Sequence, residues 1–148
     1  MARASYKGKY NPKHPEKYVG DPNNIIFRSL WERRIMIYLD NNTNVISWAS
    51  EELAIPYVSP EDNRIHRYYP DFIVKARRNN QIVHMIWEVK PHYQTVEPKK
   101  KKRNTKHYIT EVMTYAKNTA KWEAARKFCE DRGWEFQIIT EKELKLNG

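Results

Sequence analysis

Two acidic residues stand at the ends of apolar, strand-like segments. In the stretch VHMIWEVKP, residues 83–91, a mostly apolar run ends in Glu88 and Lys90. Side chains alternate between the two faces of a strand, so Glu88 and Lys90 are expected to project to the same side. A second acid, Asp71, comes directly after Pro70 and directly before another apolar run. Both acids are therefore expected at a strand end, mounted on a rigid element.

The segments 67–76 and 81–90 are typical of two strands joined by a tight turn at Arg77–Asn80. In such a hairpin the start of one strand lies opposite the end of the other, which brings Asp71 close to Glu88. Two carboxylates repel each other unless a cation lies between them, and dense oxygen ligands suit Mg²⁺. A neighbouring ammonium group can orient or deprotonate a water molecule. The pattern favours a metal site, and an edge salt pair at a frayed strand end is the alternative.

The remaining elements predict a mixed α/β fold. Apolar residues at helical spacing, together with capping residues, predict helices, and β-branched or aromatic runs bounded by turn residues predict strands. The expected elements are a helix over 28–40, one or two short strands within 45–57, the strands 67–76 and 81–90, a helix over 105–132 with a potential break at 118–119, a strand over 136–140, and a short helix begun by the capping box of Thr140 and Glu143. The final strand–helix–strand order predicts a crossover that leaves the last strand parallel to its partner.

Glu32 has two interpretations. It shares the inward face of the first helix with Ile35, Met36 and Leu39, and a carboxylate on that face needs a partner. The spacing of Ser29 and Glu32 is also that of a capping box, in which the acid serves the helix alone. The residues by themselves leave both interpretations open.

The acidic pattern resembles that of the PD-(D/E)xK nuclease superfamily. Its elements are Pro70-Asp71, sixteen intervening residues, Glu88-Val89-Lys90 and an upstream helical Glu. A wider pattern is similar to the endonuclease subunit of heteromeric transposases, and more closely to the small head-completion nucleases of large tailed phages. The stretches that carry it are RSLWE (28–32), SWASEE (47–52), IPY (55–57), RYYPDF (67–72), EVKP (88–91) and NTAKW (118–122). The resemblance extends from about residue 17 to residue 141.

The resemblance implies a restriction-endonuclease-like core with a mixed β-sheet flanked by helices, and metal-dependent cleavage of DNA. Asp71, Glu88 and the Val89 carbonyl would be ligands of Mg²⁺, with Mn²⁺ as the alternative. Lys90 would contact the attacking water and the scissile phosphate. Glu32 would complete the site or hold Lys90. The expected products carry a 5′-phosphate and a 3′-hydroxyl, and the expected role is to finish packaged phage heads before tail joining, with head and neck proteins as partners.

A basic run follows the acidic pattern, and the whole chain is basic. Its 27 Lys and Arg against 18 Asp and Glu give a net charge of +9, which is typical of a protein that meets a polyanion. The residues expected to contact DNA phosphates are Lys99, Lys100, Lys101, Lys102, Arg103 and Lys106. Such contacts carry little sequence specificity. A solvated loop, or a nuclear-import signal, would have the same composition.

Residues 1–24 lack an apolar period and are expected to form an extended basic arm before a single nuclease domain over 25–148. No long apolar run is present, and Cys129 is the only cysteine, so we expect no membrane span and no intramolecular disulfide. The expected location is the host cytoplasm, with association with the virion also considered. Alternative functions are a transposase-type or junction-cleaving endonuclease, and a structural DNA-binding neck or capsid-vertex protein with a vestigial site. The sequence does not predict the oligomeric state.

Overall fold

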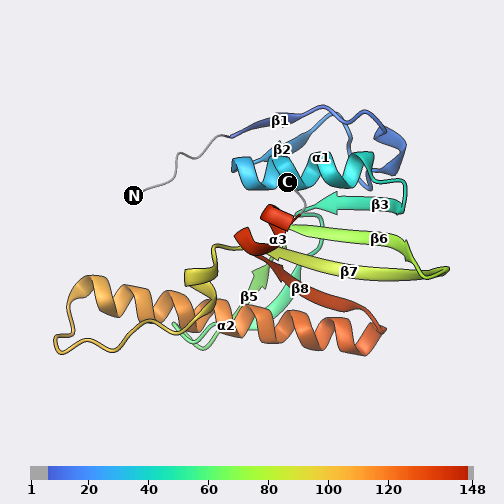
Figure 1. The fold of residues 1–148 in the computed structure, drawn as a ribbon. Helices are drawn as coiled ribbons and strands as arrows, with labels where there is room; N and C mark the ends of the chain where they lie inside the picture. Colours follow the sequence, from blue (N-terminus) through green and yellow to red (C-terminus); the bar gives the residue numbers. More distant parts are fainter. Residues whose placement is uncertain (1–6, 147–148) are drawn as a thin grey trace.

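The fold was analysed in a computed structural model, which describes residues 7–146 of the chain (Figure 1). The strands are β1 (Gly8–Tyr10), β2 (Ile25–Phe27), β3 (Val45–Ser50), β4 (Ile55–Val58), β5 (Ile65–Tyr68), β6 (Phe72–Arg78), β7 (Gln81–Val89) and β8 (Glu135–Ile139). The helices are α1 (Leu30–Asn41), α2 (Lys106–Arg132) and α3 (Glu141–Leu146), with 3₁₀ turns η1 (Pro15–Lys17) and η2 (His92–Thr95). Five successive strands, β3 to β7, lie between the two long helices of the described residues.

The central sheet has four strands in the order β3-β6-β7-β8. The pairs β3/β6 and β6/β7 are antiparallel, and β7/β8 is parallel. The parallel pair is joined by α2, so the expected strand–helix–strand crossover is present. Together with the flanking helices, this mixed sheet confirms the predicted α/β class and is consistent with a restriction-endonuclease-like core.

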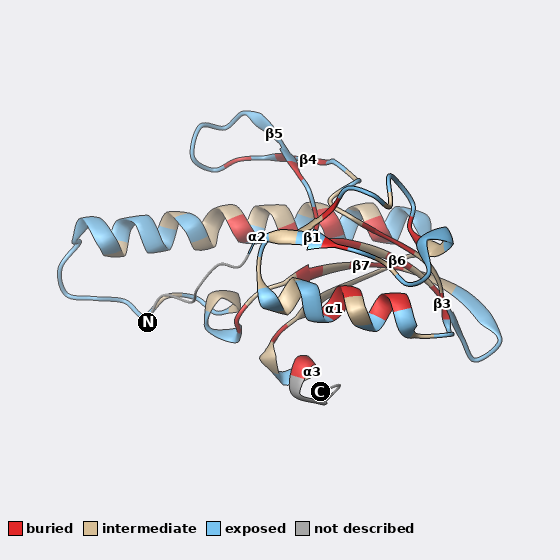
Figure 2. Ribbon diagram, turned by 90° about the horizontal axis from the view of Figure 1, so that it is seen from above, coloured by how far each residue is buried: buried red, intermediate tan, exposed pale blue. Residues whose placement is uncertain are grey.

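Two hydrophobic cores cover the two faces of the sheet. On one face, Met36 and Leu39 of α1 pack in a cluster with Phe72 and Met85. On the other face, residues of α2 such as Trp122 pack in a cluster with Ile86 and the small sheet. Seen from above in Figure 2, α1 and α2 lie on opposite sides of the strands, and each carries buried residues. The buried apolar residues of α1 and of the C-terminal half of α2 thus attach the two helices to the strands.

The turn between β6 and β7 fixes the register of the hairpin. Arg78 pairs with Gln81, so the turn consists of Asn79 and Asn80 alone. Both asparagines have positive φ, at 54° and 63°, which suits a two-residue turn because Asn tolerates this region better than most residues. The predicted hairpin is therefore present, with a turn two residues shorter than expected.

The N-terminal segment differs from the expected extended arm. Residues 8–10 form β1, which pairs with β2, and the side chains of Tyr10 and Tyr18 are buried. Both rings pack edge-on against Trp48, with ring centroids 6.2 Å and 4.8 Å apart. The described part of the segment is therefore integrated with the folded domain. The expectation was wrong here because the tyrosines of a polar-looking segment supply large apolar surfaces. Residues 1–6 of the predicted arm lie outside the described residues.

Asp40, near the end of α1, anchors this segment. Its buried carboxylate accepts hydrogen bonds from the Tyr10 hydroxyl (2.6 Å) and from the backbone N–H groups of Lys13 (2.7 Å) and His14 (2.9 Å). The Lys17 ammonium donates to the carbonyls of Asp40 and Asn42, which lie at the end of the helix. These contacts supply donors for a buried charge and partners for helix-terminal carbonyls.

The segment 67–76 is two strands rather than the single strand that was predicted. Tyr68 ends β5, which pairs with β4 in a separate two-stranded sheet, and Phe72 begins β6. Pro70 lies between them and has no N–H to donate to a continuous ladder. The chain therefore passes from the small sheet to the central sheet directly before Asp71.

Helix α2 is continuous through the potential break at 118–119, and Asn118 is buried within it. It ends as predicted at Gly133, which adopts φ 70° and whose N–H donates to the carbonyls of Cys129 and Glu130 in the last turn. The N-terminal half of α2 and the loop before it extend beyond the sheet (Figure 1). None of the helices within residues 7–146 is long and apolar enough to cross a membrane.

Candidate active site

The ends of three adjacent strands bring the predicted acids together. Ser50 of β3 pairs with Phe72 of β6, and Phe72 pairs with Trp87 of β7. Asp71, just before Phe72, therefore lies opposite Glu88, just after Trp87. The chain then leaves β7 at Lys90, whose N–H donates to the Ile139 carbonyl of β8 at 3.0 Å. The register of the sheet thus sets the positions of Asp71, Glu88 and Lys90.

The Asp71 carboxylate points toward the neighbouring strand. Its Oδ2 atom accepts a hydrogen bond from the Val89 N–H at 2.7 Å. Burial raises the pKa of Asp71 well above its usual value, and the negative charge of Glu88 raises it further, whereas the Val89 N–H lowers it. The ionised form of Asp71 is therefore disfavoured, because its protein neighbours compensate a negative charge there only in part.

Glu88 is almost fully buried, with 6% of its surface exposed. Its carboxylate accepts a hydrogen bond from the Tyr68 hydroxyl and lies 3.7 Å from the Lys90 ammonium. Burial raises its pKa, while the Tyr68 hydrogen bond and the positive charges of Lys90 and Lys121 lower it. Lys90 is more accessible, because 30% of its side chain is exposed. Glu88 thus faces the interior, whereas Lys90 reaches toward solvent from the same strand end.

Glu32 both caps α1 and belongs to the electrostatic environment of these acids. Its N–H donates to the Ser29 hydroxyl oxygen at 3.1 Å, and its carboxylate accepts from the Arg28 N–H at 3.0 Å rather than from the Ser29 N–H. Burial raises the pKa of Glu32, and the nearby charge of Lys90 lowers it. Its own charge contributes to the raised pKa of Asp71. The geometry is compatible with both interpretations of this residue.

Sequence reasoning missed Tyr68 and Lys121 as parts of this site. Tyr68 comes from the small sheet and donates to Glu88. Lys121 comes from α2, and its ammonium lies 5.9 Å from the centre of the Tyr57 ring and 6.0 Å from that of Tyr68. Burial lowers the pKa of Lys121. Lys121 is adjacent to Trp122 and four residues before Ala125, both buried, so a lysine near the inward face of this helix was a signal available in the sequence.

Glu51 is another neighbour that the sequence did not reveal. It directly follows β3 and adopts φ 53°, which is uncommon for a residue other than glycine. Its N–H donates to the Asp71 carbonyl at 3.2 Å, and its carboxylate forms an ion pair with Arg28. Glu51 therefore supports the backbone on which Asp71 is placed, and its charge raises the pKa of Glu32.

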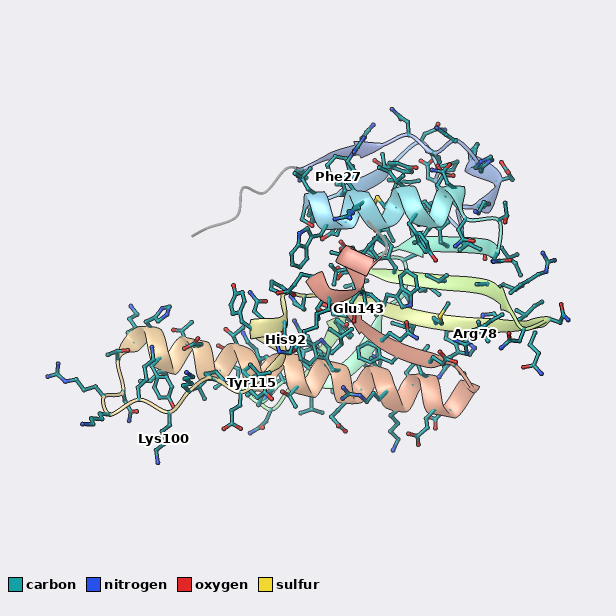
Figure 3. The ribbon with its side chains drawn as sticks, viewed as in Figure 1. Phe27, Arg78, His92, Lys100, Tyr115 and Glu143 are labelled. Atoms are coloured by element: carbon teal, nitrogen blue, oxygen red, sulfur yellow. The ribbon has the colours of Figure 1, made fainter. Side chains whose placement is uncertain are left out.

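The basic run, Lys99–Arg103, lies in the exposed loop between η2 and α2. Figure 3 shows Lys100 projecting into solvent from this loop, at the end of the molecule formed by the start of α2. Lys106, also exposed, begins the helix. The run is thus placed on a projecting segment that begins directly after the strand end bearing Glu88 and Lys90.

The oxygen donors of this site fit a hard divalent cation. Within residues 7–146 no group of three or more His, Cys, Asp and Glu side chains is arranged to hold a metal ion. The available donors are the carboxylates of the partly buried Asp71 and the buried Glu88, together with backbone carbonyls. Mg²⁺ is commonly held by one or two carboxylates and keeps several waters, so a set of this kind suffices for it. The incompletely compensated charges of Asp71 and Glu88 also favour a cation.

The mixed sheet, with an acidic strand end followed by lysine, defines a nuclease of the PD-(D/E)xK type. The chain belongs to the family described as the TnsA-like endonuclease N-terminal domain, whose family model matches residues 42–141. It is also 36% identical, over 148 residues and 97% of each chain, to the head completion nuclease of Enterobacteria phage T4. The family match contains Asp71, Glu88 and Lys90, whereas Glu32 precedes it.

Proposed function

We propose that this protein is a divalent-cation-dependent deoxyribonuclease that acts in the completion of phage heads. The observation that carries the proposal is the pair of carboxylates of the partly buried Asp71 and the buried Glu88, at one end of the central strands beside the accessible ammonium of Lys90. Membership of an endonuclease family supports the reaction. The T4 relative is named for head completion, which supports the biological role.

Asp71, Glu88 and the Val89 carbonyl would hold the cation, with Mg²⁺ as the first choice and Mn²⁺ as the alternative. When bound, such a cation polarises the phosphate and lowers the pKa of a water molecule. The hydrogen bonds to Asp71 from the Val89 N–H and to Glu88 from the Tyr68 hydroxyl orient these carboxylates before any ligand arrives. The protein thus contributes a prearranged set of oxygens.

Lys90 is proposed to act on the reacting atoms directly. Its side chain leaves the same strand end as Glu88 and is exposed enough to reach a water molecule or a phosphate oxygen. Attack by water on the phosphorus, with departure of the 3′ oxygen, leaves a 5′-phosphate on one fragment and a 3′-hydroxyl on the other. Lys90 would orient the attacking water and stabilise the charge that develops on the phosphate. Glu32 would complete the acidic environment from α1.

The basic run is proposed to hold the DNA backbone. Lys99, Lys100, Lys101, Lys102, Arg103 and Lys106 are exposed, and they follow the site in the chain. Their charges suit phosphates and carry no base readout, so cleavage should depend little on sequence. We further propose head and neck proteins as partners in the host cytoplasm, with a place in the virion as the alternative, on the basis of the T4 relative's name.

A transposase-type or junction-cleaving endonuclease is the second candidate, because the family model that matches is that of TnsA-like enzymes. A structural DNA-binding protein with a vestigial site is the third. The complete set of Asp71, Glu88 and Lys90 argues against the third, since an unused site has no reason to keep two neighbouring carboxylates that repel each other.

One assay tests these candidates together. Linear, supercoiled and branched DNA are incubated with the full-length protein in Mg²⁺ or in EDTA, beside Lys90→Ala and the control Lys127→Ala, an exposed lysine of α2. We expect cleavage by the wild type and the control in Mg²⁺ alone, and none by Lys90→Ala. Cleavage of branched DNA only would favour the second candidate. DNA binding without cleavage by the wild type would favour the third.

A further inference from the structure

A cavity of about 350 Å³ lies directly beside Lys90. It opens to solvent and lies between η2 with the segment after it on one side and the N-terminal half of α2 on the other. Tyr93 and Val96 line it from the first side, and Tyr115 and Asn118 from the second. Figure 3 marks the two walls, with His92 on η2 and Tyr115 on α2. The cavity therefore shares Lys90 with the candidate active site without being part of the acidic cluster.

The lining combines aromatic and apolar surface with hydrogen-bonding groups. Tyr93 is 67% exposed and Val96 is 47% exposed, so this wall presents large apolar groups to solvent. Asn118 and His107 add polar atoms to the cavity. Flat aromatic surface beside groups that can donate and accept hydrogen bonds is what proteins use to bind an unpaired nucleobase. The cavity is also within the range of small-molecule sites, which begins at roughly 300 Å³.

The distribution of charge indicates how a nucleotide would lie in the cavity. Lys90 stands at the end next to the candidate site, and the basic run begins directly after Pro98, another lining residue. Glu111, in contrast, lines the cavity itself. A carboxylate there disfavours a phosphate but can accept a hydrogen bond from the amino group of cytosine or adenine. The arrangement suits a base inside the cavity and its phosphate outside, near Lys90.

We infer that this cavity binds an unpaired nucleotide of the DNA strand that is cut. The inference rests on the proposed function, because it places the nucleotide next to the phosphate that Lys90 contacts. Taking a base out of a duplex costs a few kcal/mol, and least where the base is mismatched or already single-stranded. The substrates of this site are therefore DNA segments with unpaired or easily unpaired nucleotides.

The test separates nucleotide binding from cleavage. Binding of fluorescently labelled single-stranded and fully paired oligonucleotides is measured by anisotropy in EDTA, where a cation-dependent nuclease does not cut. The variants are Tyr93→Ala, Tyr93→Phe and Thr114→Trp, the last of which fills the cavity from an exposed lining position of α2. Tyr38→Ala is the control, because Tyr38 is an exposed tyrosine of α1 outside this cavity.

We expect Tyr93→Ala to weaken the binding of single-stranded DNA by about 5- to 100-fold, the range for loss of one stacked base. Tyr93→Phe should restore it, Thr114→Trp should reproduce the loss, and Tyr38→Ala should bind as the wild type does. Equal losses for paired and single-stranded DNA, or unchanged binding by both Tyr93→Ala and Thr114→Trp, would overturn the inference. Either result leaves cleavage of paired DNA in Mg²⁺ as a separate test of the proposed function.

Discussion

The Tyr68 hydroxyl donates a hydrogen bond to the Glu88 carboxylate, and these two residues belong to different sheets. Tyr68 ends β5 of the small sheet, whereas Glu88 lies near the end of β7 in the central sheet. The contact joins the two sheets at the candidate site. Burial raises the pKa of Glu88, and the hydrogen bond from Tyr68 opposes that rise. Tyr68 of the small sheet therefore favours the ionised form of Glu88, which belongs to the central sheet.

Replacing this tyrosine should change the pH dependence of cleavage. Tyr68→Phe keeps the ring and removes the donor, so the pKa of Glu88 should rise further. A carboxyl group must be ionised to hold a cation, so the acid limb of the pH–activity profile should move to higher pH. Cleavage rates from about pH 5 to about pH 9 measure the shift, with Tyr69→Phe, an exposed neighbour, as the control. An unchanged profile would show that Tyr68 does not influence the titration of Glu88.

Asp71 should be a source of instability in the protein without metal. Because folding raises the pKa of Asp71, the protonated carboxyl group stabilises the folded state fully at pH values below about 3.9, the pKa of an aspartate in the unfolded chain. This stabilisation is lost as the pH rises through the pKa of Asp71 in the folded protein. Asp71→Asn removes the charge, and its amide oxygen can still accept from the Val89 N–H. In EDTA the variant should melt several degrees above the wild type at about pH 8, since about 1 kcal/mol corresponds to about 2–4 °C in a chain of this size.

The same variant should lose cleavage completely, because an amide is a poor ligand for a hard cation. The difference in melting temperature should shrink toward about pH 4, where the wild-type carboxyl is protonated. Asp131→Asn, an exposed aspartate of α2, is the matched control and should change neither property. The opposite result would be a wild-type melting temperature that rises, relative to that of Asp71→Asn, from acid to neutral pH. It would mean that the charge of Asp71 is fully compensated without metal.

The basic run gives a prediction in terms of salt dependence. If Lys99–Arg103 contact phosphates, replacing all five with Gln should weaken binding to every duplex sequence alike. The slope of log affinity against log salt should fall by about 0.9 for each contact that is lost. Binding isotherms at several salt concentrations measure it, with Arg126→Gln/Lys127→Gln at the other end of α2 as the control. An unchanged slope would mean that these residues form a solvated loop that does not contact phosphates.

Local patterns predicted the parts of the fold that bring Asp71 and Glu88 together. The alternation of apolar residues and the Asn79-Asn80 turn determine the register of β6 and β7, and both are short-range features. The caps of α1 and α2, Ser29 and Gly133, are likewise local. The opposition of Asp71 and Glu88 follows from these features alone. The two N-terminal strands and the division of 67–76 into two strands were not predicted.

The missed features depend on contacts between distant parts of the chain. Tyr10 is buried because its hydroxyl donates a hydrogen bond to Asp40, thirty residues later, and because Trp48 packs against its ring. No pattern within residues 1–24 encodes either contact. Tyr68 reaches Glu88 because β5 pairs with β4 rather than continuing into β6, and the choice of partner strand is a tertiary property.

Glu32→Gln distinguishes the two interpretations of the first-helix acid. The Glu32 carboxylate accepts from the Arg28 N–H, and the Gln carbonyl can accept the same bond, so helix capping should survive. Gln is neutral and a much poorer ligand for a hard cation than Glu. If Glu32 serves the cation or Lys90, cleavage should fall by orders of magnitude while the melting temperature is unaltered.

We expect this loss of cleavage, because the charge of Glu32 is felt by Asp71 and is itself influenced by Lys90. Cleavage and thermal melting of the wild type, Glu32→Gln and Glu32→Ala should be compared over a range of Mg²⁺ concentrations. Glu32→Ala also removes the hydrogen bond from the Arg28 N–H, so it should lose both activity and stability, and it calibrates what that bond contributes. Full activity of Glu32→Gln at every Mg²⁺ concentration would mean that the residue only caps α1, which would restrict the site to Asp71, Glu88 and Lys90.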